Sequence, residues 1–263
     1  MVVDREVTWE KLAKMSAATL QHTPGQKYTV ADRIEEKAET HPERPFIFYQ
    51  EDRISYGELN AAANRMAHAA LEAGLGQGDT AALMMENRPE FISTWAGLAK
   101  LGVTTALINT NVRGRLLRHA LETTRAKHLI VGSECLENVL SLGGDVARTW
   151  TVYVLRDREG AQVRPPEGAL DLDEVLARMP NENPERAVRA NLIAGDDFFY
   201  IFTSGTTGLP KAARLSHMRF LGVGDAMSAV AGYGPHDVIY CVLPLYHGAG
   251  GMVVVSCALS QGA

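Results

Sequence analysis

The sequence predicts an α/β fold, with helices on both faces of a mostly parallel, doubly wound sheet. Three short apolar strands, at residues 80–85, 103–108 and 128–132, alternate with helical stretches at 89–102 and 113–124. These strands lack the polar alternation of a half-exposed sheet, so helices are expected to cover both of their faces. Because the crossovers in such folds are right-handed, the sheet is expected to be doubly wound.

Local signals justify the elements before and after this alternation. Residues 46–49 and 53–55 predict a hairpin, and a capping box formed by Ser55 and Glu58 begins the helix that follows it. A fourth strand is expected at 151–155.

The second half of the chain repeats the alternation after a break. Residues 156–190 hold four of the 11 prolines among charged residues and predict a surface connection with one short helix near 172–179. The elements expected after it are a strand at 198–202, a helix after Ser216, a strand at 238–242 and an apolar helical stretch at 250–259.

The composition is that of an ordinary globular domain. The 263 residues carry 26 Lys+Arg against 31 Asp+Glu, a net charge of −5, and the 46% of hydrophobic residues suffice for a sizeable core. This balance offers no basic footprint for nucleic acid. The apolar runs are far shorter than the ~18 residues of a membrane-spanning helix, and the N-terminus lacks a secretory signal, so a cytoplasmic protein is expected. The three widely spaced cysteines fit buried thiols better than disulfides or a zinc site.

Residues 200–211 carry the clearest chemistry, with the sequence Tyr-Ile-Phe-Thr-Ser-Gly-Thr-Thr-Gly-Leu-Pro-Lys. An apolar strand runs directly into hydroxyl residues, two glycines and a lysine. Glycines let backbone N–H groups approach an anion, hydroxyls donate to phosphate oxygens, and the lysine supplies a mobile positive charge. The stretch therefore predicts a polyphosphate-binding loop at the carboxyl end of a strand, where open α/β sheets place their ligands.

Other interpretations of the motifs are weaker. A standard P-loop needs Gly before the Lys and a hydroxyl after it, whereas Pro210 precedes Lys211 and Ala212 follows it. A flexible Ser/Thr/Gly linker does not explain the strand in front and the Pro-Lys pair behind. The sequence also lacks G-x-G-x-x-G, G-x-S-x-G, H-E-x-x-H and C-x-x-C, the usual anchors of nicotinamide, esterase and zinc chemistry.

Residues 203–211 resemble the T-S-G-[ST]-T-G-x-P-K signature of the adenylate-forming superfamily, which includes acyl-CoA synthetases, luciferases and peptide-synthetase adenylation domains. Leu243-Pro-Leu-Tyr-His247 resembles the second core motif of that family. Ile54-Ser-Tyr-Gly-Glu-Leu59 and Glu86-Asn-Arg-Pro-Glu90 are similar to its N-terminal landmarks. Three more stretches look like the branch of fatty acid transport proteins and very-long-chain acyl-CoA synthetases: Gly97-Leu-Ala-Lys-Leu-Gly102, Ala106-Leu-Ile-Asn-Thr-Asn111 and Leu243-Pro-Leu-Tyr-His-Gly-Ala-Gly250.

The resemblance implies a long- or very-long-chain fatty acid–CoA ligase that uses ATP, Mg²⁺ and coenzyme A. A fatty carboxylate would attack the α-phosphorus of MgATP to give an acyl-adenylate and pyrophosphate, and the thiol of coenzyme A would then displace AMP. The first step needs the negative charge of the phosphates to be neutralised. The residues implied to bind the nucleotide are Thr203, Ser204, Gly205, Thr206, Thr207, Gly208 and Lys211.

The same resemblance implies further roles. Thr206 would be the hydroxyl that contacts Mg²⁺, and Lys211 and His247 would be catalytic, with His247 beside the reacting carboxylate. The acyl pocket would be bordered by Tyr246, Gly248, Ala249 and Gly250.

Residues 1–263 are expected to form an incomplete N-terminal AMP-binding domain. Residues from about 45 to 190 would make most of a first α/β subdomain, and 195–263 would begin a second one that carries the phosphate loop. The family's adenine, ribose and C-terminal lid motifs are not in the sequence, so the chain alone is expected to be catalytically incomplete. Two alternatives stay open: a ligase for an aryl, bile or amino acid, and a non-catalytic nucleotide-binding module. Peripheral membrane contact and a homodimer also stay open.

Overall fold

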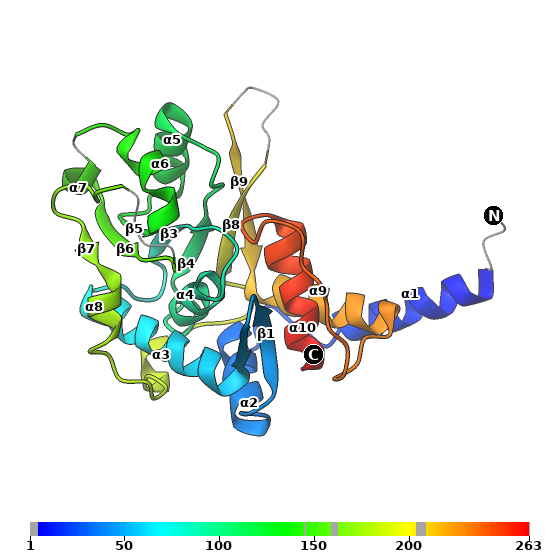
Figure 1. The fold of residues 1–263 in the computed structure, drawn as a ribbon. Coiled ribbons are helices and arrows are strands. Elements are labelled where there is room, and N and C mark those ends of the chain that lie inside the picture. The colour runs from blue at the N-terminus through cyan, green and yellow to red at the C-terminus, as the bar shows by residue number, and fades with distance from the viewer. Residues whose placement is uncertain (1–4, 145, 159–162, 204–208, 263) are drawn as a thin grey trace.

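A computed structural model describes residues 5–144, 146–158, 163–203 and 209–262 of the chain (Figure 1). The helices are α1 (Arg5–Thr19), α2 (Val30–Thr40), α3 (Tyr56–Glu72), α4 (Pro89–Ala99), α5 (Gly114–Thr124), α6 (Leu136–Leu140), α7 (Val146–Thr149), α8 (Leu172–Leu176), α9 (His217–Ala231) and α10 (Val255–Gln261). The strands are β1 (Pro45–Tyr49), β2 (Asp52–Ser55), β3 (Thr80–Met84), β4 (Thr104–Leu107), β5 (His128–Gly132), β6 (Thr151–Leu155), β7 (Leu170–Asp171), β8 (Asp197–Thr203) and β9 (Lys211–Ser216). Two 3-10 turns, η1 (Ser133–Cys135) and η2 (Arg186–Arg189), and a π-helical segment, η3 (Gly248–Val254), complete the described elements.

Seven strands form one sheet in the order β7-β6-β5-β3-β4-β8-β9. Every neighbouring pair in it is parallel except β8 and β9, which are antiparallel. β1 and β2 form a separate antiparallel hairpin, as expected. The predicted fold class, a mostly parallel sheet with helices, is confirmed. β8 and β9 extend the same sheet as β3 to β6, and the predicted division into two subdomains near residue 190 stays a prediction.

The side chains of the central strands alternate between two hydrophobic cores. In β3, Ala81 and Leu83 belong to a core that includes residues of α2, α3 and α4, whereas Ala82 and Met84 belong to a second core with residues of α5 and α6. Successive side chains of a strand point to opposite faces, so both faces of the sheet are covered. This explains why these strands are apolar without alternation.

Helix starts follow the expected capping chemistry. The Ser55 hydroxyl accepts a hydrogen bond from the Glu58 amide (3.2 Å), and the Glu58 carboxylate accepts one from the Ser55 amide (2.8 Å), which confirms the capping box of α3. Pro89 occupies the first turn of α4, where its missing N–H costs nothing. Ser216 caps α9 by accepting from the Arg219 amide.

Four parts of the chain differ from the sequence-based expectation. Residues 238–242 form no strand, because no described strand pairs with them, and Val238, Tyr240 and Val242 are 72%, 87% and 69% exposed. The stretch expected to be helical from 250 begins instead as the π-helical η3 and continues as α10. The sequence pattern does not predict β9, since Lys211–Ser216 mixes charged and apolar residues without strict alternation. α1 was not expected either, and it extends away from the sheet while packing on α9 (Figure 1).

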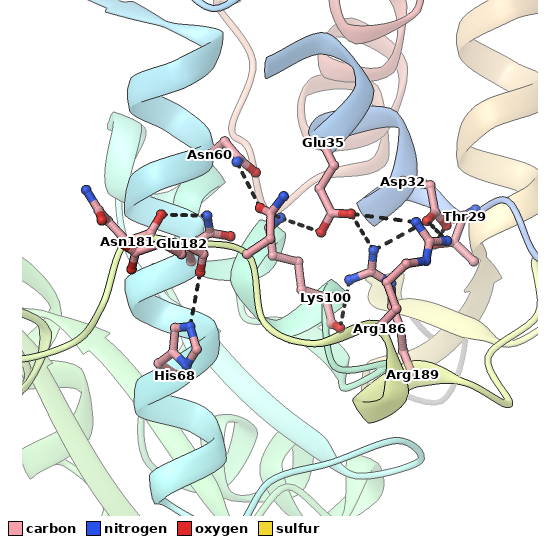
Figure 2. A network of polar contacts seen from close by, with 12 residues as sticks. Thr29, Asp32, Glu35, Asn60, His68, Lys100, Asn181, Glu182, Arg186 and Arg189 are labelled. Carbon is pink, nitrogen blue, oxygen red and sulfur yellow. Dashed lines mark hydrogen bonds and ion pairs between the residues drawn. The ribbon is translucent and has the colours of Figure 1, made fainter. Parts of the chain in front are cut away.

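The connection between β6 and β8 is fixed to the helices rather than lying loosely on the surface. Figure 2 shows two of its arginines, Arg186 and Arg189, turned toward Asp32 and Glu35 of α2. Arg189 is only 5% exposed, and its guanidinium lies 2.5 Å from the Glu35 carboxylate. The fully buried amine of Lys100 lies 2.7 Å from the same carboxylate. Most residues of 181–190 are exposed, so the connection lies on the surface as predicted, and these ion pairs anchor it to the helices.

Candidate nucleotide and acid site

The two ends of the predicted phosphate loop meet at the carboxyl end of β8. Thr203 is the last residue of β8 and pairs across the antiparallel ladder with Lys211, the first residue of β9. The Thr203 hydroxyl lies 3.5 Å from the Lys211 carbonyl oxygen, to which it can donate. The predicted binding residues Ser204, Gly205, Thr206, Thr207 and Gly208 lie outside the described residues. The described ends, Thr203 and the exposed Lys211, lie at the carboxyl end of β8, where open α/β folds bind ligands.

A cavity of about 290 Å³ opens beside these loop ends. It lies at the carboxyl ends of β4 and β8, against α5. Its lining residues are Leu107, Ile108, Asn109, Val112, Leu116, Ala120, Phe202, Thr203, Pro210, Tyr246 and His247. Three residues singled out from the sequence, Thr203, Tyr246 and His247, therefore meet at one cavity. Most of the other lining side chains are apolar, as in sites that take the apolar part of a small molecule.

The segment that carries Tyr246 and His247 is held in place by Asn87, from the loop between β3 and α4. The Asn87 side chain accepts a hydrogen bond from the Leu245 amide (2.7 Å) and donates one to the Leu243 carbonyl oxygen (2.9 Å). Two bonds from one planar amide fix both the position and the direction of a chain segment. Two of the sequence landmarks are thus parts of one structure.

Tyr246 and His247 also have specific partners of their own. The Asn111 amide lies 3.3 Å from the Tyr246 hydroxyl oxygen. Nδ1 of the exposed His247 accepts a hydrogen bond from the Ala249 amide (3.3 Å) at the start of η3. In the neutral ring this leaves the proton on Nε2, which can then donate to a carboxylate or phosphate oxygen.

The glycines after His247 let η3 pack closely on the preceding segment. A Cβ atom added to Gly250 would collide with the carbonyl oxygen of Pro244, and one added to Gly251 would collide with that of Leu245. Gly248 has more room, since the nearest atom to such a Cβ would be the Ile201 side chain at 3.9 Å. The lining of the cavity does not include Gly248, Ala249 or Gly250, and their predicted place at an acyl pocket stays a prediction.

The other wall of the cavity is built by the loop after β4. The Asn138 side chain donates to the carbonyl oxygens of Thr110 (2.8 Å) and Val112 (3.0 Å), and the Asn109 side chain accepts from the Asn111 amide (2.8 Å). These bonds satisfy the backbone of an irregular segment that would otherwise lack partners. They hold Asn109 and Val112 at the cavity.

The cysteines take no part in this site. The described cysteines are all free; Cys135 and Cys257 are buried, as expected, whereas Cys241 is half-buried. Burial, assisted by the negative charge of Glu134, raises the pKa of the Cys135 thiol to about 12. Since the thiolate is the reactive form, Cys135 is expected to be inert.

Residues of the structurally described ranges do not form a metal site by themselves. No group of three or more His, Cys, Asp or Glu side chains among them lies close enough to hold a metal ion. Mg²⁺ often binds through substrate phosphates and waters with only one or two protein ligands. Thr206, the residue predicted to contact Mg²⁺, lies outside the described residues.

Comparison with known proteins decides the family. The profile of the AMP-binding enzyme family matches residues 34–263. The chain belongs to the AMP-binding enzyme family. Within this family of adenylate-forming ligases its relatives include fatty acid transport proteins and acyl-CoA ligases.

Two curated relatives illustrate this. The chain is 35% identical over 240 residues to long-chain fatty acid transport protein 6 of Homo sapiens. This match covers 91% of the chain and 38% of that protein. It is 31% identical over 244 residues to the medium/long-chain-fatty-acid–CoA ligase FadD6 of Mycobacterium tuberculosis, again covering 91% of the chain and 38% of the relative. The chain thus spans well under half the length of these relatives.

Solved structures confirm the adenylate-forming fold. The anthranilate CoA ligase AuaEII, solved in complex with anthranoyl-AMP, superposes with a TM-score of 0.79 at 21% identity, covering 93% of the chain and 45% of that structure. At this identity the likeness establishes the fold of an AMP-binding enzyme and leaves its acid substrate open. Among the residues described here, no helix of this AMP-binding enzyme has both the length and the apolar character to cross a membrane.

Sequence reasoning missed several residues of this site. Asn87 lies inside a matched landmark, but nothing in the landmark shows which distant segment it holds. Asn138 and His119, which contact the walls of the cavity, carry no signal at all, because each acts through side-chain bonds to the backbone of a segment remote in sequence.

Proposed function

We propose that this chain supplies the phosphate loop and part of the acid-binding wall of an AMP-forming acyl-CoA ligase that acts on long- or very-long-chain fatty acids. The observation that carries the proposal is the shared cavity. Both ends of a polyphosphate-binding loop, the apolar ends of β4 and β8 and the His247 ring border one space at the carboxyl edge of the sheet.

Each residue receives a role from its place and chemistry. The backbone amides and hydroxyls of the loop, together with Lys211, would hold the phosphates of MgATP and offset their negative charge. Thr206 would contact the magnesium ion, whose contribution is to neutralise phosphate charge. The Nε2 proton of His247 would orient an oxygen of the acid's carboxylate toward the α-phosphorus.

The apolar lining supports a fatty acid as the acid. Most of the cavity lining is apolar, and Leu107, Val112, Leu116 and Phe202 present surface that suits an alkyl chain. One relative described above is named for long-chain fatty acids and the other for medium- and long-chain fatty acids, which supports a fatty acid as the substrate class. Coenzyme A would be the acceptor in the second step, with its thiol displacing AMP from the acyl-adenylate.

The test is a comparison of three variants for MgATP binding by isothermal titration calorimetry. Lys211→Ala and Thr206→Ala should each weaken MgATP binding about tenfold, since each removes a contact to a charged group. Lys127→Ala is the matched control, because it removes the same charge from an exposed lysine directly before β5, at the amino ends of the parallel strands and away from the loop ends. Equal affinity in wild type and both loop variants would refute the assignment of this loop.

A further inference from the structure

His119, on α5, points to a function that neither its sequence nor a family motif suggests. Its ring Nε2 lies 3.1 Å from the carbonyl oxygen of Pro210, a residue 91 positions away. Pro210 is the last residue of the phosphate loop before β9 begins at Lys211. Since a carbonyl oxygen can only accept, Nε2 must be the protonated nitrogen and the donor.

The surroundings explain why this one bond matters. β9 is the edge strand of the seven-stranded sheet, so its outer side has no neighbouring strand. α5 contacts β9 from the face of the sheet that the second core covers. The same helix contributes Leu116 and Ala120 to the lining of the cavity, and Pro210 lines it too. α5 therefore touches both the cavity and the end of the loop.

The hydrogen bond between His119 and Pro210 can affect Lys211 through the geometry of the peptide unit that joins Pro210 to Lys211. The Pro210 carbonyl and the Lys211 amide belong to one planar peptide unit. The proline ring fixes φ at Pro210, and a hydrogen bond to the carbonyl oxygen fixes the remaining rotation of that unit. The direction in which the chain enters Lys211 is thus set by the His119 ring as well as by the β8–β9 ladder.

We propose that His119 is a positioning residue for the phosphate loop: its donated hydrogen bond to Pro210 orients the peptide that presents Lys211 to the nucleotide. This inference rests on the proposed function, because it assumes that Lys211 binds phosphate. A positioning role predicts that nucleotide affinity changes while the fold stays intact.

The chain offers a closely matched control. His68, on α3, also places its Nε2 3.1 Å from a backbone carbonyl oxygen, that of Glu182, on the connection before β8. The residue type, the bond length and the kind of acceptor are the same. Glu182 is not among the residues that line the cavity, so losing this bond removes a similar stabilising contact without touching the loop.

The experiment measures MgATP affinity by calorimetry and the unfolding midpoint in urea for wild type, His119→Ala, His119→Gln and His68→Ala. We expect His119→Ala to weaken MgATP binding about fivefold, the effect of one lost hydrogen bond. His119→Gln should restore most of the affinity, because the glutamine amide can donate to the same oxygen. His68→Ala should bind MgATP like wild type.

Each outcome separates the two levels of the proposal. Wild-type affinity in His119→Ala would overturn the positioning role and leave the proposed function standing. A loss of affinity shared equally by His119→Ala and His68→Ala would also overturn it, since the effect would then come from general destabilisation. No MgATP binding by the wild-type chain would contradict the proposed function itself, and the role of His119 would fall with it. If His119→Ala does not fold, the glutamine variant decides, because an affinity far below wild type in a folded His119→Gln protein would contradict a donor role.

Discussion

The Asn87 side chain accepts the Leu245 amide hydrogen at 2.7 Å across 158 residues of sequence and so joins two landmarks of the family into one structural unit. A second hydrogen bond, from the Asn87 side-chain amide to the Leu243 carbonyl oxygen, means that this side chain binds the segment at two points. The segment from 243 to 247 has no strand partner among the described residues, so this side chain takes over part of what a sheet ladder would supply. His247 and Tyr246 owe their place at the cavity to this contact.

Replacing Asn87 should therefore loosen the segment. Asn87→Ala leaves the Leu245 amide and Leu243 carbonyl without their partner, and we expect a loss of about 1–3 kcal/mol in the free energy of unfolding. Urea unfolding followed by circular dichroism measures it. Asn60→Ala is the control, since the Asn60 amide bonds only the exposed Asn183 side chain (3.0 Å). An equal cost in both variants would show that the Asn87 contact has no special weight.

The glycines after His247 provide a second test of the packing. Gly250→Ala and Gly251→Ala each force a Cβ into a backbone carbonyl that cannot move without displacing the segment, so each should destabilise the chain by about 2 kcal/mol or more. Gly248→Ala, where the nearest atom is 3.9 Å away, should be nearly neutral. Thermal unfolding of the three variants compares them directly. A Gly248→Ala variant as damaged as the other two would contradict the close approach seen here.

The buried amine of Lys100 predicts an unusual dependence of stability on alkaline pH. Burial lowers the pKa of Lys100 to about 8 from an ordinary 10.5, although the Glu35 carboxylate opposes the shift. Between these two values the unfolded chain binds more protons at this site than the folded chain, so the Lys100 contribution to stability rises with pH.

Lys100→Met should remove this rise. The unfolding free energy of wild type relative to Lys100→Met is expected to increase by about 1–2 kcal/mol between pH 8 and 9.5. Taking the difference cancels the tyrosines and thiols that titrate in the same range. The exposed Lys127→Met serves as the control and should give no such trend. A constant difference across this range for Lys100→Met would disprove the prediction.

At acid pH, Asp225 of α9 is also expected to make stability rise with pH, because its carboxyl ionises more readily in the folded chain than in the unfolded chain. Burial alone would raise the pKa of Asp225, but hydrogen bonds from His22 (2.6 Å), Arg33 (2.7 Å) and Ser260 outweigh it and hold the pKa well below its usual range. The stability that Asp225 contributes is complete above pH ~4 and is lost as the pH falls below that value.

Asp225→Asn should therefore cost about 1–3 kcal/mol at pH 7 and less at pH 2, where the ionised Asp225 still keeps part of its contribution because its folded pKa lies well below the usual range. Urea unfolding of wild type and variant at both pH values measures the two costs. Glu137→Gln, which breaks an exposed ion pair with Arg113, should cost little at either pH. A cost for Asp225→Asn that does not change with pH would mean that the charge of Asp225 is unimportant.

The sequence predicts the central strands and helices because their signals are local. Apolar strands such as 128–132 and the Ser55–Glu58 box can be recognised within a few residues. β9 escapes prediction because it is an edge strand whose exposed residues, such as Lys211 and Arg214, need not be apolar. Residues 238–242 show the reverse case, since their composition favours a strand but pairing requires a partner that no local pattern reveals.

The candidate site likewise has parts that the sequence predicts and parts that it does not. Its chemistry can be predicted from residues 203–211 and from His247, because spacing along the chain encodes it. The contacts of Asn87, Asn138 and His119 cannot be predicted so, because each joins a side chain to backbone atoms that lie close only once the sheet has formed.

The central claim is that the cavity between the loop ends and His247 receives the acid and the nucleotide. Methyl-labelled protein titrated with a stable long-chain acyl-sulfamoyl adenosine, a mimic of the acyl-adenylate, tests it most directly by NMR. We predict large shifts for the methyl groups of Leu107, Ile108 and Leu116, which line this cavity, and none for Leu192, which lines a separate cavity between Lys27 and Arg186. Binding with shifts at Leu192 and none at Ile108 would contradict the account.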